Sequence, residues 1–267
     1  MSRVSSTLRS LPYSCGLIPF ITAGNPDIVS TEKALKILDS CGADIIEIGL
    51  PYSDPLADGP VIQQASKQAL SQGMNFDMLL SLLHKINGHI RAPLVMFTYY
   101  NPLIARGILS FLTEIAAAGI TGIIIPDLPL EEADYILDIC NNLSIELILL
   151  VTPTSSKNRI DRIISKSQGV IYVVSSTGVT GLRDQINKNM QEFVASIRKK
   201  TDKLIILGFG ISQEKHVRQI VQWEVDGIVI GSAFVNCLAD TSVDNGLEKL
   251  KSFCTSVKNV IMHPGPC

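Results

Sequence analysis

Eight short apolar runs rich in β-branched residues recur along this chain, and amphipathic stretches separate them. The runs have the length of buried strands, and the stretches between them have helical spacing. Strict alternation of strands and helices implies parallel strands joined by right-handed crossovers. Eight such units in 267 residues match a closed (β/α)8 barrel, the TIM-barrel class of α/β fold. The expected strands are Gly16–Thr22, Asp44–Gly49, Pro93–Thr98, Gly122–Ile125, Glu146–Val151, Val170–Val174, Lys203–Gly208 and Gly227–Ile230.

No linker or low-complexity tract interrupts the pattern, so we expect a single barrel domain over residues 1–267. Within it we expect an N-terminal helical segment over 1–14 and a disordered tail over 258–267. An open, doubly wound sheet made of the same units is the structural alternative. The expected helices are Ser30–Cys41, Val61–Gln72, Asp77–Asn87, Ile108–Ala118, Glu131–Asn141, Asn158–Ser167, Met190–Lys199, Gln213–Trp223 and Asn245–Val257.

The composition bears on partners and compartment. The net charge is −2, so no basic surface indicates binding to nucleic acid or to an anionic membrane. No apolar run is long enough to cross a bilayer, and the six cysteines are scattered without a Cys-x-x-Cys pair. These features are typical of a soluble protein in a reducing compartment. We therefore expect the cytoplasm, or the plastid stroma if the gene is plastid-encoded.

One carboxylate stands inside the second apolar run, and the loop after that run carries two more. Glu47 lies in the run, and Asp54 and Asp58 lie in the Pro- and Gly-rich loop Pro51–Pro60. Burying a charge is costly unless it is paired or takes part in chemistry, and parallel-sheet enzymes place reactive groups at the carboxyl ends of strands. The segment therefore indicates an acid–base site. The alternative is a structural, ion-paired glutamate followed by turn-forming aspartates.

Gly-rich turns follow the last two expected strands. Gly208 ends the seventh strand and Gly210 follows it, and Gly231 and Ser232 follow the eighth, where a helix begins. Phosphate groups in barrels commonly bind at these two loops, because exposed backbone N–H groups and helix N-termini attract anions. The alternative is that the glycines only permit tight turns. A third Gly-rich stretch, Ser175–Gly181, follows the sixth strand and suits either a flap that closes over a phosphate or an ordinary loop.

Six segments together resemble the tryptophan synthase alpha chain family. The likeness runs from about Val4 to about Ser256, and the segment Glu47–Pro60 is highly specific to that family. At Ser176 the enteric bacterial form has an arginine, so this loop is similar to the plant and cyanobacterial version. The segments are Pro19–Asp27, Glu47–Pro60, Tyr99–Pro102, Pro126–Pro129, Gly178–Gly181 and Gly208–Ser212.

The resemblance implies a lyase that cleaves indole-3-glycerol phosphate to indole and glyceraldehyde 3-phosphate by a retro-aldol reaction. It also implies that indole passes to a pyridoxal-phosphate-dependent beta chain in an α2β2 assembly, contacted through Pro51–Pro60 and Asn101–Pro102. The implied catalytic residues are Glu47 and Asp58. The implied substrate-binding residues are Phe20, Ile62, Tyr99, Tyr172 and Phe209. The implied phosphate-binding residues are Gly181, Gly210, Gly231 and Ser232.

Two other lyase mechanisms fit the residues poorly. A Schiff-base aldolase needs a lysine at the site, and none of the eight expected strands ends in lysine. A metal-dependent aldolase needs clustered ligands, whereas the four histidines occupy expected helix, loop or tail positions that suit the surface. We expect neither a metal nor an organic cofactor in this chain. The functional alternatives are a stand-alone indole-releasing lyase, another sugar-phosphate barrel, and a non-catalytic barrel that activates a beta chain.

Overall fold

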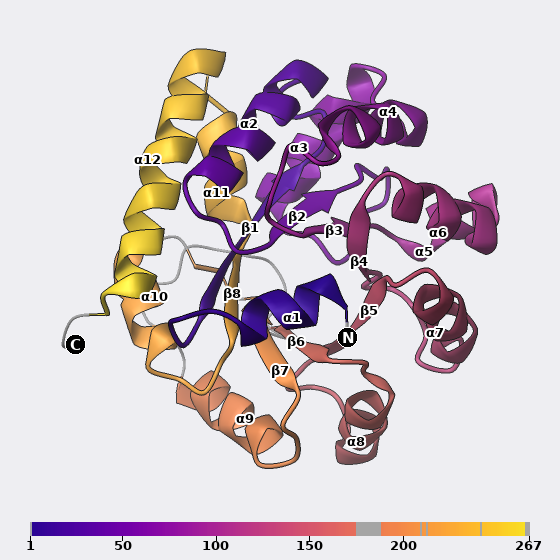
Figure 1. Cartoon of the computed structure of the whole chain (residues 1–267), viewed down its shortest axis with the longest axis vertical. Helices are drawn as coiled ribbons and strands as arrows, with labels where there is room; N and C mark the ends of the chain where they lie inside the picture. The colour runs from indigo at the N-terminus through magenta and orange to yellow at the C-terminus, as the bar shows by residue number, and fades with distance from the viewer. Residues whose placement is uncertain (1, 175–187, 209, 212, 241, 265–267) are drawn as a thin grey trace.

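Eight parallel strands close into a barrel in the order β1 to β8, and the helices surround it (Figure 1). The computed structural model describes residues 2–174, 188–208, 210–211, 213–240 and 242–264. Neighbouring strands pair in parallel around the whole ring, and β8 pairs with β1, which confirms the predicted (β/α)8 barrel. The strands are β1 Gly16–Thr22, β2 Ile46–Gly49, β3 Leu94–Phe97, β4 Ile120–Ile124, β5 Glu146–Val151, β6 Val170–Val174, β7 Leu204–Gly208 and β8 Gly227–Ile230.

Helices connect successive strands on the outside of the barrel, and two connections are longer than a single helix. The unit after β2 carries α3 and α4, where helices were expected over Val61–Gln72 and Asp77–Asn87, and the unit after β3 carries α5 and α6. The helices are α1 Arg3–Arg9, α2 Ile28–Ser40, α3 Pro60–Ser71, α4 Phe76–Ile86, α5 Tyr100–Arg106, α6 Ile108–Ala117, α7 Ala133–Asn142, α8 Lys157–Lys166, α9 Lys188–Arg198, α10 Glu214–Val221, α11 Ser232–Leu238 and α12 Val243–Met262.

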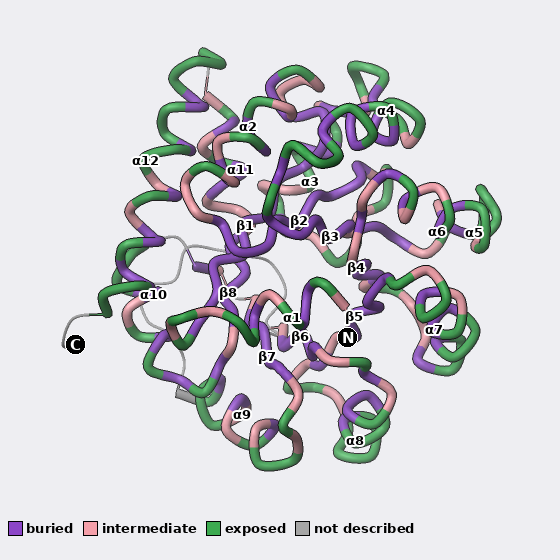
Figure 2. The backbone as a smooth tube through the Cα atoms, viewed as in Figure 1, coloured by how far each residue is buried: buried purple, intermediate pink, exposed green. Residues whose placement is uncertain are grey.

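The strands are buried on both faces, and this creates two cores (Figure 2). Side chains alternate across a strand, so neighbouring residues face opposite sides of the barrel wall. Ile46 and Ile48 of β2 belong to the large core between wall and helices, whereas Ile45, which directly precedes β2, belongs to the cluster inside the barrel. Glu47, between the two outward-facing isoleucines, therefore faces the barrel interior.

Helix α1 closes the amino-terminal end of the barrel. Its Val4 and Leu8 pack into the interior cluster, and Ser5 contacts Glu146, the first residue of β5. Ser5 Oγ lies 2.7 and 2.6 Å from the two carboxylate oxygens of Glu146, and Ser5 N donates to the same carboxylate at 3.2 Å. A Cβ at Gly169 would lie 2.2 Å from Ser5 Oγ, so this close approach requires glycine there.

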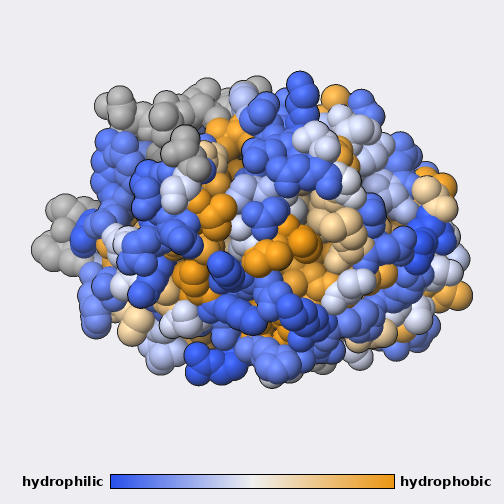
Figure 3. Space-filling model, turned by 90° about the horizontal axis from the view of Figure 1, so that it is seen from above, coloured by the Kyte–Doolittle hydropathy of each residue, from blue (hydrophilic) through white to orange (hydrophobic). Residues whose placement is uncertain are grey.

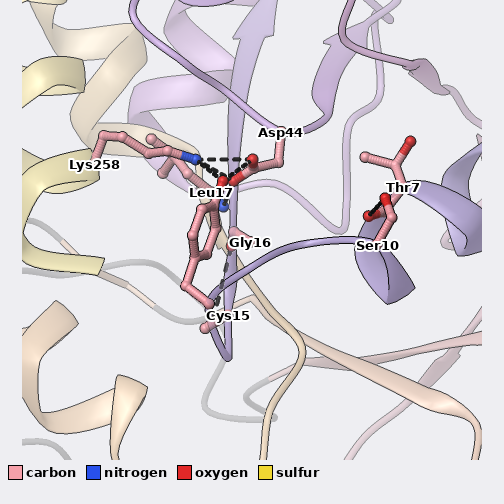
Figure 4. A network of polar contacts seen from close by, with 8 residues as sticks. Thr7, Ser10, Cys15, Gly16, Leu17, Asp44 and Lys258 are labelled. Atoms are coloured by element: carbon pink, nitrogen blue, oxygen red, sulfur yellow. Dashed lines mark hydrogen bonds and ion pairs between the residues drawn. The ribbon is translucent and has the colours of Figure 1, made fainter. Parts of the chain in front are cut away.

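A buried ion pair ties α12 to the same end of the barrel (Figure 4). Lys258 Nζ lies 2.8 and 2.7 Å from the two carboxylate oxygens of Asp44, which also accepts a hydrogen bond from Leu17 N at 2.7 Å. Tyr13 Oη donates to Asp44, and Lys258 Nζ lies 4.4 Å from the centre of the Tyr13 ring. The C-terminal helix is therefore fixed to β1 and to the start of β2.

Several expected boundaries were wrong. Helix α12 extends to Met262, so the segment expected to be a disordered tail from 258 is helical over its first five residues. The reason is that Val257 and Ile261 continue the apolar face of the helix into the core. At the other end, α1 occupies only Arg3–Arg9 of the segment 1–14 that was expected to be helical. His216 was expected at the surface but is 3% exposed on the inner face of α10.

The face of the molecule seen in Figure 3 is largely hydrophilic, with hydrophobic patches between the hydrophilic residues. An open groove of about 640 Å³ lies between α11 and α12, lined by residues that include Cys237, Lys249 and Phe253. It lies between two of the surrounding helices, outside the barrel wall. Within the described part of the chain, the helices are all too short or too polar to span a bilayer.

Candidate active site

Glu47 is a buried carboxyl group with little to compensate its charge. It is 1% exposed in β2, level with Phe20 of β1 and Val95 of β3. Its Oε1 has no hydrogen-bond partner among the described residues. Burial raises the pKa of Glu47 to about 8, because the charged form loses its hydration. At neutral pH the group is therefore mainly protonated and able to donate a proton.

Asp58 lies in the loop between β2 and α3 and is half-buried. Burial raises the pKa of Asp58 to about 6, and a hydrogen bond from Tyr99 opposes that rise. Tyr99 Oη donates to Asp58 Oδ2 at 3.0 Å and accepts from Ala57 N at 3.0 Å, so it holds the loop at two adjacent residues. At neutral pH Asp58 is mainly ionised. The site therefore holds one protonated and one ionised carboxyl group.

Tyr172 of β6 connects the two carboxyl groups electrostatically. It is 7% exposed, and burial together with the charges of Glu47 and Asp58 raises the pKa of its hydroxyl well above the usual value. A Cβ at Gly208 would lie 2.5 Å from the Tyr172 ring, so glycine at the end of β7 leaves room for this side chain. The phenol therefore stays protonated and can donate a hydrogen bond at the carboxyl end of the barrel.

Phe20, Ile62 and Gly231 come together beside the carboxyl end of β1. A Cβ at Gly231 would lie 3.4 Å from Ile62 Cδ1 and 3.6 Å from Phe20 Cδ1. Gly231 directly precedes α11, whose first residue is Ser232, and Gly210 lies in the turn after β7. Phe20 and Ile62, which were expected to bind the substrate, are thus neighbours of Gly231, which was expected to bind the phosphate. Phe209 and Gly181, two further expected site residues, lie outside the described residues.

Phe97 and Tyr52 were not among the individual site residues expected from the sequence, although Tyr52 lies in the expected site loop Pro51–Pro60. The Phe97 ring stands edge-on to Phe20 at 5.7 Å between centroids and edge-on to Tyr99 at 6.3 Å. The Tyr52 ring stacks on Tyr99 at 5.0 Å. Phe97 could have been found from strand alternation, because Val95 and Phe97 lie two residues apart in β3 and face the same side. Tyr52 lies in an irregular loop, where no periodic pattern indicates direction.

The fold and these groups define a class. A closed (β/α)8 barrel with an acid and an ionised carboxylate at the carboxyl ends of its strands has the arrangement of a barrel enzyme that transfers protons. Among the described residues, no group of three or more His, Cys, Asp or Glu side chains is placed to hold a metal ion.

Comparison with known proteins identifies the family. The model of the family described as "Tryptophan synthase alpha chain" matches residues 12–262. A tryptophan synthase alpha chain from Pyropia yezoensis is 53% identical over 98% of this chain and 100% of that protein. One from Acaryochloris marina is 50% identical over 93% of each. This chain belongs to the tryptophan synthase alpha chain family, whose members are lyase subunits of tryptophan biosynthesis.

Solved structures agree with this assignment. The structure of Mycobacterium tuberculosis tryptophan synthase aligns with a TM-score of 0.89 and 32% identity, over 97% of this chain and 98% of that one. A tryptophan synthase complex from Pyrococcus furiosus aligns with a TM-score of 0.84 and 31% identity, over 92% and 99%. A further Pyrococcus furiosus structure, described as showing mutual activation of the a2b2 complex, aligns with a TM-score of 0.86.

Proposed function

We propose that this chain cleaves indole-3-glycerol phosphate to indole and glyceraldehyde 3-phosphate, with Glu47 and Asp58 as the catalytic residues. Family membership supports the reaction. The observation that carries the residue roles is the difference in protonation between the two carboxyl groups, with a pKa of about 8 for Glu47 and about 6 for Asp58. When the surroundings push the pKa values of two carboxyl groups apart, one group can act as the acid while the other stays charged.

Glu47 moves two protons in this proposal. Cleavage of the bond between indole C3 and the glycerol side chain requires a proton at C3 and removal of the proton from the adjacent hydroxyl group. The protonated Glu47 donates to C3, and the resulting carboxylate then accepts the hydroxyl proton as the carbon–carbon bond breaks and the carbonyl of the aldehyde forms. The proton count balances, because Glu47 ends the cycle protonated.

Asp58 stabilises the charge that this proton transfer creates. Protonation at C3 makes the indole ring a cation whose positive charge is centred on nitrogen. An ionised carboxylate beside the indole N–H stabilises that charge in a poorly hydrated site. The two hydrogen bonds of Tyr99 to Ala57 and Asp58 fix the loop in place for this role.

The remaining expected residues bind the substrate around these two groups. Phe20, Ile62, Tyr99, Tyr172 and Phe209 surround the indole and glycerol portions, and Gly181, Gly210, Gly231 and Ser232 bind the phosphate, mainly through backbone N–H groups. The proximity of Gly231 to Phe20 and Ile62 supports one continuous site. Phosphate binding far from the reacting bond contributes alignment of the reacting atoms.

The partner in this proposal is a tryptophan synthase beta chain, in an α2β2 assembly. The support is the description of a Pyrococcus furiosus relative as an a2b2 complex with mutual activation. Pro51–Pro60 and Asn101–Pro102 form the contact surface, since both lie at the carboxyl end of the barrel. Algal and cyanobacterial relatives are consistent with the cytoplasm, or with the plastid stroma for a plastid-encoded chain.

Indole release tests this proposal and separates it from its alternatives. The purified chain is given indole-3-glycerol phosphate, alone and with a tryptophan synthase beta chain. We expect slow indole formation by the chain alone and a marked increase when the beta chain is added. Full-speed turnover that no beta chain changes would support a stand-alone lyase. Absence of indole under both conditions, with a stimulated beta chain, would support a non-catalytic partner.

A further inference from the structure

Three contacts connect an exposed side chain to Asp58. Asn101 is exposed near the start of α5, and its Nδ2 donates to Tyr52 Oη at 3.0 Å. The Tyr52 ring stacks on the Tyr99 ring, with centroids 5.0 Å apart and an interplanar angle of 26°. Tyr99 Oη then donates to Asp58 Oδ2 at 3.0 Å. The carboxylate is therefore three contacts away from the surface that Asn101 occupies.

The Tyr99 ring has few directions in which to move. It is 3% exposed and lies between the stacked Tyr52 ring and the edge-on Phe97 ring. Its hydroxyl also accepts from Ala57 N at 3.0 Å, beside Asp58 in the chain. Of the two aromatic neighbours, Phe97 belongs to a strand of the wall, whereas Tyr52 belongs to a loop. Tyr52 is therefore the adjustable neighbour.

We propose that Tyr52 is a positioning residue for Asp58, and that its hydrogen bond to Asn101 makes this positioning responsive to the beta chain. A partner that contacts Asn101 alters the Tyr52 hydroxyl contact, and the stacked rings carry the change to Asp58. The inference rests on the proposed function for the reaction and the partner. The contacts among Tyr52, Tyr99 and Asp58 do not depend on it.

The groups around Asp58 determine how it titrates. Tyr99, two residues after the end of β3, donates a hydrogen bond to it, and Tyr172 of β6 interacts electrostatically with both Asp58 and Glu47. The charge of Asp127, in the loop after β4, contributes to raising the pKa of the Tyr99 hydroxyl. Among these, the Tyr99 hydrogen bond lowers the pKa of Asp58. Loss of the Tyr52 ring should weaken that bond and raise the pKa of Asp58.

The first experiment measures the titration of the Asp58 carboxyl carbon by ¹³C NMR in the isolated full-length chain. Tyr52→Leu should raise the midpoint by roughly half a pH unit, and Tyr52→Phe, which keeps the ring, should restore it. Tyr135→Phe is the matched control, because Tyr135 is 59% exposed on α7, and it should change nothing. Thermal melting checks that each variant is folded. An unchanged midpoint in Tyr52→Leu would overturn the positioning role.

The second experiment measures kinetics and needs turnover. In Tyr52→Leu, kcat should fall about tenfold with little change in KM, because alignment and not binding is lost. Tyr52→Phe and Asn101→Leu should each reduce stimulation by the beta chain about threefold, and the double variant should lose no more than either single variant. Additive losses would refute the coupling. If the unaltered chain makes no indole, the proposed function fails, and the ¹³C titration alone decides the positioning role.

Discussion

Glu47 and Glu146 are both 1% exposed on barrel strands, Glu47 within β2 and Glu146 at the start of β5, but they have opposite surroundings. At the amino end, Glu146 accepts hydrogen bonds from Ser2, from the Ser5 hydroxyl and from Ser5 N. Near the carboxyl end, Glu47 has an oxygen without a hydrogen-bond partner among the described residues. The same side chain is therefore compensated at one end of the barrel and left uncompensated at the other.

The difference separates the stabilising end of the barrel from the reactive end. Asp44, also near the amino end, is paired with the buried ammonium group of Lys258. Asp58, at the carboxyl end, accepts a hydrogen bond from Tyr99. Among the described residues, no lysine, arginine or histidine forms an ion pair with it. Burial raises the pKa values of Glu47 and Asp58, which is useful for proton transfer and costs stability.

The largest expected effect is on activity at the reactive end. Glu47→Gln removes the only group assigned to move both protons, so kcat should fall by about a thousandfold or more. Glu146→Gln is the matched control and should keep near-normal kcat in the folded protein, because Ser2 and Ser5 satisfy Glu146 at the start of β5. Indole release measures both variants. Substantial turnover by Glu47→Gln would contradict the assignment of both proton transfers to Glu47.

The next effect is on stability at the amino end. Lys258→Met leaves the buried Asp44 without its cation and should lower the free energy of unfolding by about 3–5 kcal/mol. Lys36→Met is the control, because the Lys36–Glu32 pair lies on the surface, and it should cost less than about 1 kcal/mol. Urea denaturation compares the two. Equal losses would show that the pair at Asp44 acts like a surface salt bridge.

A smaller loss is expected for the second carboxyl group of the reactive end. Asp58→Asn keeps the shape but cannot offset the charge on the indole ring, so kcat/KM should fall about a hundredfold. The pH profile of kcat/KM should rise through about 6 as Asp58 ionises and fall through about 8 as Glu47 ionises. In Asp58→Asn the limb near pH 6 should disappear. If kcat/KM of Asp58→Asn still rises near pH 6, that rise is due to another ionising group.

The smallest expected effect is on stability, and it compares substitutions of the two glutamates directly. Glu146→Gln weakens charge-assisted hydrogen bonds and should destabilise the fold by about 1–3 kcal/mol. Glu47 has a folded-state pKa above its unfolded value, so its contribution to stability is present at acid pH and is lost as pH rises through about 8. Glu47→Gln should therefore be more stable than the parent at pH 9. Melting curves at pH 5 and pH 9 measure the stability of both variants relative to the parent.

Much of the architecture was predictable because it depends on periodic patterns. The bounds of β1, β5, β6 and β8 match the sequence prediction, since continuous apolar residues define a strand buried on both faces. Helix α5 was not among the expected helices. Proline is tolerated in the first turn of a helix, where its missing N–H has no partner to lose, and Pro102 occupies that turn.

The candidate site was only partly predictable for a different reason. Glu47 was recognisable because a charge interrupts an apolar strand, and Asp58 because of the resemblance to a family. The contacts of Tyr99 with Ala57 and Asp58, and the stack with Tyr52, depend on how an irregular loop folds over the strand ends. No local pattern specifies those positions. The burial of Glu146 by an N-terminal helix likewise depends on packing between distant segments.

The titration of the Glu47 carboxyl group tests the account most directly. The ¹³C signal of this carboxyl carbon, assigned by its absence in Glu47→Gln, is followed from pH 4 to pH 10 in the unliganded chain. We predict a midpoint of about 8, because the buried group has little to compensate its charge. A midpoint near 4.5, the ordinary glutamate value, would contradict the account.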